Sequence, residues 1–316
     1  MRIAVALLVA VFACAAQAQY PNRPVKLIVP FPPAGATDIV GRIVAQKLGE
    51  QLGQSVVVEN RPGAGGSIGS DLVAKSSPDG YTLLIATSST HSIGPVLQKL
   101  PYDPLKDFAP ITHVANVPNV LVVSPKLPVG SVAELIALAK SKPGQLNFAS
   151  SGVGTIVHLN AELFKMLAGV DLVHVPYKGT ALSIPDVANG SIAMLFDSLA
   201  SVQPHIKAGR VRPLAVNAQK RSALMPEVPT LAEAGMPAFD RYTWFGMFAP
   251  AGTPAAIVDR VQGEVLAALK APDLLERFAA AGAEAVGSTP EQFVERIKSD
   301  AAKWAQVIKA ANVKVQ

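Results

Sequence analysis

The sequence contains little cysteine, few aromatic residues and few charged ones. Cys14 is the only cysteine among 316 residues, aromatic residues make up 6% and charged residues 16%. Because Cys14 lies in a segment that we expect to be removed, the mature chain should carry neither a disulfide nor thiolate chemistry. Basic residues are scattered and form no stripe with interleaved aromatics, so nucleic acid is not an expected partner.

A second absence concerns long apolar runs, of which there is only one. It extends from Ile3 to Ala13, follows Arg2 and precedes the small residues of Ala16-Gln17-Ala18. This order predicts a signal peptide over residues 1–18 that is cleaved after Ala18, and hence a periplasmic protein. The alternative is a transmembrane anchor, but the run is well short of the roughly 20 residues that span a bilayer.

The length of the remaining chain predicts two lobes. Without the leader, residues 19–316 are too many for one typical hydrophobic core. Hydrophobic residues make up 50% of the chain, which favours a soluble, well-packed protein, and we expect a monomer. The formal net charge of +5 gives a mildly positive field that favours anionic ligands.

Short β-branched runs alternate with helical patterns along the chain, which is typical of parallel sheets with crossover helices. Strands are predicted at residues 25–29, 55–58, 82–86, 120–123, 146–148, 172–175, 192–196 and 214–216. Helices are predicted after a cap at Thr37 or Asp38, and at residues 254–270, 272–281 and 289–310. The predicted fold class is therefore α/β.

Two extended segments are predicted to cross between the lobes. Val120 to Ser124 runs into Pro125, and Trp244 to Phe248 ends near Pro250, so neither can continue as a paired strand. Lobe 1 would then comprise residues 19–121 and 247–316, and lobe 2 residues 122–246, joined by a two-strand hinge.

Two loops have the composition of an anion-binding site. The first runs from Phe31 to Asp38, and the second from Ser150 to Thr155 before the helix that carries His158. In open α/β sheets, ligands collect beyond the carboxyl ends of the strands, where helix N-termini favour negative charge. Since one loop lies in each predicted lobe, a small dicarboxylate could bridge the two.

Five motifs cover most of the mature chain. They are PFPPAGATD at 30–38, ENRPGAGGSIG at 59–69, ASSGVGTIVHLNAELFK at 149–165, HVPYKG at 174–179 and EVPTLAEAG at 227–235. Together they resemble the Bug family, periplasmic receptors of tripartite tricarboxylate transporters. The resemblance implies a two-lobed type II periplasmic-binding-protein fold, with a mixed sheet flanked by helices in each lobe. It also implies that backbone N–H groups and ordered water hold the ligand's carboxylates, although Ala34 replaces a usual glycine.

The loops and the resemblance together predict the ligand-binding residues. These are Phe31, Pro33, Ala34, Gly35, Ala36, Thr37, Asp38, Ser88, Ser150, Ser151, Gly152, Gly154, Thr155, Tyr177 and Asp197. Asp38 could instead be only a helix cap. Asp197, which ends a strand, could meet an amine on the ligand or stabilise the hinge.

Enzymatic alternatives fit the sequence poorly. Gly65 to Gly69 satisfies G-x-S-x-G, but a loop with Pro62 separates Ser67 from the preceding strand, and no histidine follows His205. The five histidines show no ligand spacing for zinc, and Val157 replaces the third glycine of a dinucleotide fingerprint. We therefore expect no catalytic residue, no metal and no cofactor.

The predicted function is that of a periplasmic solute-binding protein. It would capture a dicarboxylate, tricarboxylate or related organic acid between two lobes and deliver it to the membrane subunits of a tripartite tricarboxylate transporter. The alternative is a sensor module that presents the same kind of ligand to a signalling receptor. In both cases the ligand would shift the population toward a closed state.

Overall fold

The computed structural model describes residues 20–236 and 242–313. The predicted signal peptide over residues 1–18, with Cys14, lies outside this range. Within the described residues, no helix combines the length and the apolar character that crossing a bilayer requires.

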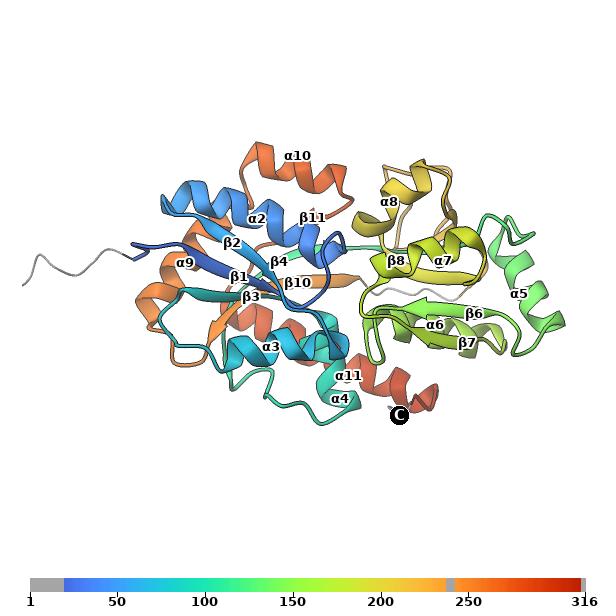
Figure 1. Cartoon of the computed structure of the whole chain (residues 1–316), viewed down its shortest axis with the longest axis horizontal. Coiled ribbons are helices and arrows are strands. Elements are labelled where there is room, and N and C mark those ends of the chain that lie inside the picture. The colour runs from blue at the N-terminus through green and yellow to red at the C-terminus, as the bar shows by residue number, and fades with distance from the viewer. Residues whose placement is uncertain (1–19, 237–241, 314–316) are drawn as a thin grey trace, which may run out of the picture.

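The larger of two sheets is built from the ends of the chain (Figure 1). Its strands stand in the order β11 (Glu284–Ala285), β4 (Phe108–Val117), β10 (Thr243–Pro250), β3 (Thr82–Thr87), β1 (Val25–Val29) and β2 (Val56–Asn60). β1 pairs in parallel with β2 and β3, whereas β10 runs antiparallel between β3 and β4. The sheet is therefore mixed, as predicted.

Helices cover both faces of this sheet (Figure 1). They are α2 (Ala36–Leu52), α3 (Ser67–Ala74), α4 (Gly94–Leu97), α9 (Ala255–Ala268), α10 (Pro272–Ala280) and α11 (Pro290–Ala310), with the short turns η2 (Ala64–Gly66) and η3 (Ser89–Ile93). In α2 the buried positions Val40, Val44 and Leu48 recur at helical spacing and face the core. A capping box between Thr289 and Gln292 begins α11, which confirms the predicted start.

The smaller sheet comes from the middle of the chain. Its strands stand in the order β7 (Val173–Pro176), β6 (Asn147–Ser150), β8 (Met194–Ser198), β5 (Asn119–Val123) and β9 (Arg212–Asn217). Its helices are α5 (Val132–Ser141), α6 (Ile156–Ala168), α7 (Ile184–Asn189) and α8 (Leu199–Lys207), with the turn η4 (Thr180–Leu182). Figure 1 shows α6 and α8 on opposite faces, which matches the burial of Phe196 on one side and Leu195 on the other.

The chain passes between the sheets at two places. β4 ends at Val117 and β5 begins at Asn119, so Pro118 alone separates them; the return lies before β10 begins at Thr243. The side chains of Asn119 and Thr243 are hydrogen-bonded at 3.2 Å and tie the two connections together. The predicted divisions after residues 121 and 246 fall inside β5 and β10 rather than between sheets. Where the two rigid units divide stays a prediction.

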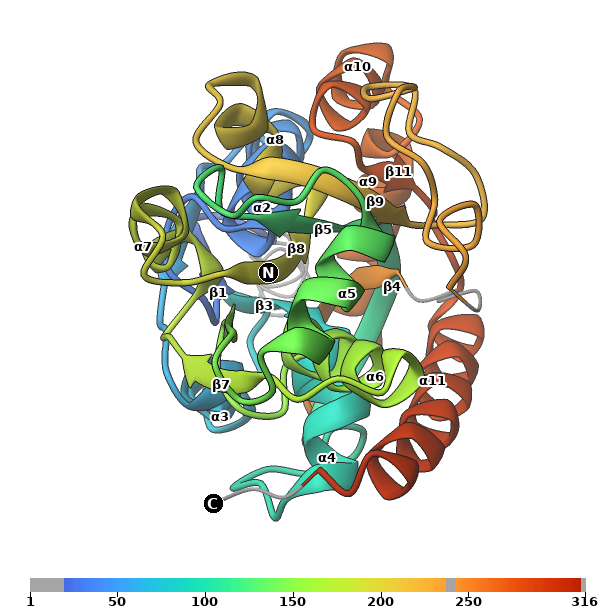
Figure 2. The same cartoon turned by 90° about the vertical axis from the view of Figure 1, so that its right-hand side faces the viewer.

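A third segment joins the two halves. Phe293, near the start of α11, packs with Trp244 and Phe248 under the larger sheet. Trp304 and Val307, about three to four turns later, belong to the core of the smaller sheet. Figure 2 shows α11 running beside α6. The C-terminal helix therefore contributes to both cores.

One expectation about local structure was wrong, and one strand was missed. α2 is capped by Gly35 and not by Thr37 or Asp38, because the extended residue before the helix lies two or three positions earlier. β4 is not among the predicted strands; it contains Pro110, which it tolerates at an irregularity in its pairing with β10.

Replacing Gly246 by alanine should destabilise the larger sheet. A Cβ at Gly246 would overlap the ring of Phe293, which is fully buried and cannot move away. We expect the free energy of unfolding, measured with urea, to fall by about 3 kcal/mol. The matched control is Gly263→Ala in α9, where a Cβ has nothing within 4 Å; it should stabilise by roughly 0.5–1 kcal/mol. Equal effects of the two substitutions would contradict this packing.

Candidate functional site

A cavity lies where the loops of the two sheets meet. It is found beyond the carboxyl ends of β1, β3 and β8, the usual place for a ligand in an α/β sheet. Its lining comprises Phe31, Pro32, Gly35, Ala36, Thr37, Thr87, Ser89, Ser151, Ile156, Val157, Gly179, Thr180, Ala181, Asp197, Ser198, Thr243 and Phe245. No lysine, arginine or histidine is among these residues.

The first loop presents the start of α2 to the cavity. Gly35, Ala36 and Thr37 line it, and the first N–H groups of a helix have no partner within the helix. Ala34 adopts a left-handed conformation, with φ at 65°, which turns the chain into the helix. Any residue other than glycine is uncommon at this angle, and β-branched or bulky residues would be the most strained.

Asp38 supports this loop from behind. Its carboxylate accepts hydrogen bonds from the Ala34 N–H at 3.0 Å, from Arg42 Nε at 2.9 Å and from Asn60 Nδ2 at 2.9 Å. Burial opposes ionisation, but the bonds from Arg42, Asn60 and Ala34 outweigh it and hold the pKa of Asp38 below its usual range. Asp38 does not line the cavity. Asp38 is therefore an ionised side chain that holds the Ala34 backbone in place, and not the helix cap that the sequence predicts.

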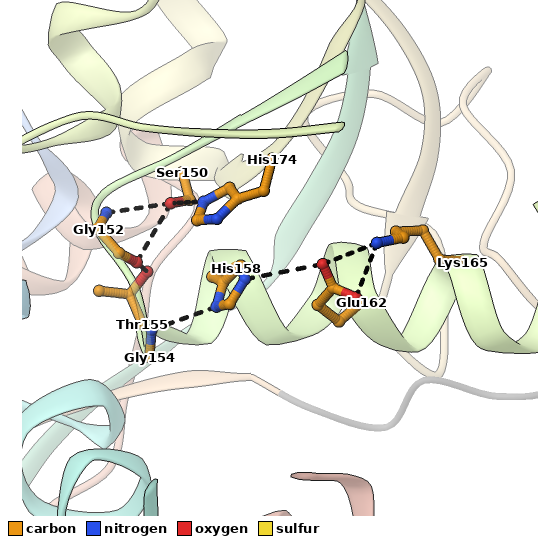
Figure 3. Close-up of polar contacts among 8 residues, drawn as sticks. All are labelled: Ser150, Gly152, Gly154, Thr155, His158, Glu162, Lys165 and His174. Carbon is orange, nitrogen blue, oxygen red and sulfur yellow. Dashed lines mark hydrogen bonds and ion pairs between the residues drawn. The ribbon is translucent and has the colours of Figure 1, made fainter. Parts of the chain in front are cut away.

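The second loop, Ser150 to Thr155, is closed by its own side chains (Figure 3). The Gly152 N–H donates to Ser150 Oγ at 3.1 Å, and Thr155 Oγ1 donates to the Gly152 carbonyl at 2.8 Å. The Gly154 N–H donates to Nδ1 of His158 at 3.2 Å. The N–H groups of Gly152 and Gly154 are therefore engaged within the loop, and Ser151 is the loop residue in the cavity wall.

Two stacked imidazoles lie behind the second loop (Figure 3). The rings of His158 and His174 are 4.0 Å apart, and His174 Nε2 lies 2.6 Å from Ser150 Oγ. Since Nδ1 of His158 accepts a hydrogen bond, this ring is neutral and carries its proton on Nε2, 3.7 Å from Glu162. Burial, His174 and Lys165 lower the pKa of His158 to about 3. Burial and Lys165 lower that of His174 to about 4.

The two halves touch each other around the cavity. Ser89, from the larger sheet's side, accepts a hydrogen bond from the Ile156 N–H at the start of α6, at 3.1 Å. A Cβ on Gly179 would lie 2.7 Å from Cδ of Pro32 in the other half. These contacts leave no room for larger residues at the junction.

Asp197 and Ser198 form the end of the cavity at α8. Asp197 accepts hydrogen bonds from the Ser198 N–H and from Ser201 Oγ, both at 2.8 Å. Burial raises the pKa of Asp197 to about 6, although hydrogen bonds from Ser201, Thr180 and Ser198 favour its ionised form.

Six of the predicted residues line the cavity: Phe31, Gly35, Ala36, Thr37, Ser151 and Asp197. The other nine lie behind or beside the lining: Pro33, Ala34, Asp38, Ser88, Ser150, Gly152, Gly154, Thr155 and Tyr177. Tyr177, for example, donates its hydroxyl to Asp186 at 2.6 Å. Which residues contact a ligand stays a prediction.

Eleven lining residues are not among the predicted ligand-binding residues. They are Pro32, Thr87, Ser89, Ile156, Val157, Gly179, Thr180, Ala181, Ser198, Thr243 and Phe245. Thr87 and Ser89 belong to the polar run after the third predicted strand, from which only Ser88 was chosen, and Ser198 ends a strand, a signal that could have found it. Thr243 and Phe245 lie far along the chain from the loops and carry no such signal.

The hydrolase alternative has no support in the geometry. Ser67 Oγ donates to the Ala64 carbonyl at 2.9 Å and has no hydrogen bond to a histidine. In the described part of the chain, no group of three or more histidine, cysteine, aspartate or glutamate residues is arranged to hold a metal.

Acid should destabilise the protein through the buried imidazoles. The pKa of histidine is about 6.5 in an unfolded chain, so the folded state, in which the pKa of His158 is about 3, binds fewer protons as the pH falls. Stability is therefore lost from about pH 6.5 downward, by up to roughly 1.4 kcal/mol per pH unit for each such group. His158→Asn keeps an acceptor for Gly154 and removes the titration.

Between pH 6.5 and about pH 4.5 the His158→Asn variant should lose about 2 kcal/mol less unfolding free energy than the wild type. Urea unfolding at both pH values measures the difference. His205→Asn is the control, because His205 is part-exposed and lies on α8, away from the second loop; its curve should stay closer to that of the wild type. Parallel losses in His158→Asn and the wild type would refute a neutral His158.

Known proteins resemble this chain in both sequence and fold. The chain matches the family described as "Tripartite tricarboxylate transporter family receptor" over residues 40–313. It superimposes on the periplasmic binding protein BugD with a TM-score of 0.90 at 36% identity, covering 94% of this chain and 100% of BugD. The predicted two-lobed periplasmic-binding-protein fold is thereby confirmed.

Two further solved relatives contain bound acids. A protein of R. palustris, solved with adipate, gives a TM-score of 0.90 at 39% identity and covers 94% of this chain and 99% of its own. MatC from Rhodopseudomonas palustris, with bound malate, gives 0.87 at 31% identity and covers 92% of this chain and 100% of its own. The chain therefore belongs to the tripartite tricarboxylate transporter receptor family, which includes the Bug proteins, and is a solute-binding protein and not an enzyme.

Proposed function

We propose that this protein binds a small organic acid in the cavity between its lobes and delivers it to a membrane transporter of the tripartite tricarboxylate type. The observation that carries the proposal is the pair of helix starts at the cavity. Ala36 and Thr37 of α2 come from one half, and Val157 of α6 from the other; the Ile156 N–H before it already donates to Ser89. Two helix N-termini facing one cavity make an anion site without any basic side chain.

The wall chemistry supports a carboxylate in particular. Thr37, Thr87 and Ser151 add hydroxyl groups next to the two helix starts. Hydroxyl and backbone N–H donors make short, charge-assisted bonds to a carboxylate in a cavity from which water is largely removed. The relatives solved with adipate and malate support the same class of ligand.

The place of action is the periplasm, and the partner a set of membrane subunits. Family membership and the predicted signal peptide over residues 1–18 support both. A signalling receptor remains the second candidate partner, because the same ligand-bound surface could be recognised by either.

Closure of the lobes is the mechanism that we propose. The Ser89 to Ile156 hydrogen bond and the contact of Gly179 with Pro32 join the halves directly. A ligand that bonds to both α2 and α6 is fully bound only when these contacts form. It therefore shifts the population toward the closed state by its difference in affinity for the two states.

A carboxylate ligand should raise the thermal stability of the mature protein, residues 19–316. A compound that binds only the folded state stabilises by about 2.7 kcal/mol at a hundredfold excess over its Kd. We would screen aliphatic dicarboxylates, citrate, amino acids and benzoates by thermal shift, with the matching amides as controls. Shifts with acids but not with their amides are expected. Shifts with neutral sugars or amines alone would overturn the proposal.

Replacing Gly179 by alanine should hold the lobes apart. The backbone of Gly179 is extended, with φ at 178°, so alanine fits the lobe itself. Its Cβ would meet Pro32 only across the junction. We expect unchanged stability without ligand, an affinity for the best acid from the screen lowered by roughly tenfold or more, and a larger radius of gyration by X-ray scattering.

The matched control for that variant is Gly130→Ala in the same lobe. A Cβ there has only an ordinary contact, 3.7 Å from Oε2 of Glu134, and faces no residue of the other half. It should bind ligand and close as the wild type does. If Gly179→Ala binds and compacts like Gly130→Ala, closure does not use this contact.

A further inference from the structure

The only formal charge in the cavity wall has the wrong sign for a receptor of acids. Among the described residues that line the cavity, Asp197 is the single ionisable side chain. It is 3% exposed, so solvent screens it little. A ligand carboxylate placed against it would be repelled, so this negative charge needs a donor or a cation as its partner.

The hydrogen bonds of Asp197 are those of a carboxylate and not of a neutral acid. One oxygen accepts from the Ser198 N–H and the other from Ser201 Oγ, both at 2.8 Å, and Thr180 donates as well. These three donors favour the ionised form, because each bond is stronger to a carboxylate than to a neutral acid. An ionised carboxylate has about four acceptor positions, so one more donor can bind.

The place of Asp197 in the fold leads to the same reading. It stands next to Ser198, which caps α8, so it occupies the helix end that would otherwise attract an anion. The starts of α2 and α6, by contrast, have no ionisable side chain in the lining; the nearby Asp38 is engaged by Arg42 and Asn60. The cavity therefore has an anion-binding side and a donor-binding side.

We propose that Asp197 selects acids that also carry a hydroxyl or ammonium group, an inference that rests on the proposed function. The ligand carboxylate binds at α2 and α6, and the hydroxyl or ammonium group donates to Asp197. A plain dicarboxylate of the same length is disfavoured, because its second carboxylate would face that of Asp197. The substrate class is hydroxy or amino acids.

Matched ligands test this selection. Succinate, 4-hydroxybutyrate and 4-aminobutyrate share a four-carbon chain and differ only in the group opposite the carboxylate, and glutarate with its hydroxy and amino counterparts extends the set by one carbon. Malate against succinate tests a hydroxyl beside a carboxylate. By titration calorimetry on the mature protein, we expect at least one hydroxy or amino acid to bind about tenfold tighter than its dicarboxylate.

The variant Asp197→Asn should invert this preference. It keeps the shape and the acceptor for Ser198 but removes the charge, so dicarboxylates should bind more tightly and amino acids less tightly, changing their ratio by roughly tenfold or more. Asp186→Asn is the control, because Asp186 lies in the same lobe, bonds to Tyr177 and does not line the cavity. A loss of structure would weaken every ligand alike and leave the ratio unchanged.

Ser201→Ala gives a second test that does not alter the cavity wall. It removes one donor to Asp197, so the neutral acid becomes easier to form and the penalty against dicarboxylates should shrink. The inference is overturned if the wild type prefers dicarboxylates and Asp197→Asn weakens them, which would make Asp197 a proton donor. It is also overturned if the ratio does not change while Asp197→Asn keeps the unfolding free energy of the wild type. If none of these acids binds, the proposed function fails with it.

Discussion

An α-helix leaves its first N–H groups without partners inside the helix, and the starts of α2 and α6 line the same cavity, although the Ile156 N–H of α6 donates to Ser89. With no lysine, arginine or histidine in the lining, these groups and a few hydroxyls are the available donors for an anion. Such donors act only if they are held in place, because a helix end that moves loses its directed bonds. Much of the surrounding structure provides that support.

The charged and titratable groups near the cavity serve mainly as supports behind it. Asp38, held by Arg42 and Asn60, bonds to the Ala34 N–H and fixes the first loop. The neutral imidazoles of His158 and His174 fix the second loop through Gly154 and Ser150. Asp197 differs, since it lines the cavity itself. A wall with one negative charge and two positive helix ends favours a ligand that has an anionic group at one end and a hydrogen-bond donor at the other.

The two halves must also be joined so that α2 and α6 can meet. Pro118 connects β4 to β5, the chain returns to the larger sheet at β10, and Asn119 and Thr243 are hydrogen-bonded where these two connections meet the sheets. The helix α11 contributes Phe293 to one core and Trp304 to the other. Around the cavity, small residues such as Gly179 permit close approach to Pro32.

The sequence by itself determined the fold class, the strand Val25–Val29, the start of α11 and the two loops at the cavity. Those features depend on local composition and periodicity, and the five motifs identified the family. Only the tertiary structure decided which loop residues face inward. Asp38 does not line the cavity and is hydrogen-bonded to Asn60, and the Gly154 N–H donates to His158, whose ring stacks on that of His174. Partners distant in sequence make these choices, and a local pattern contains no information about them.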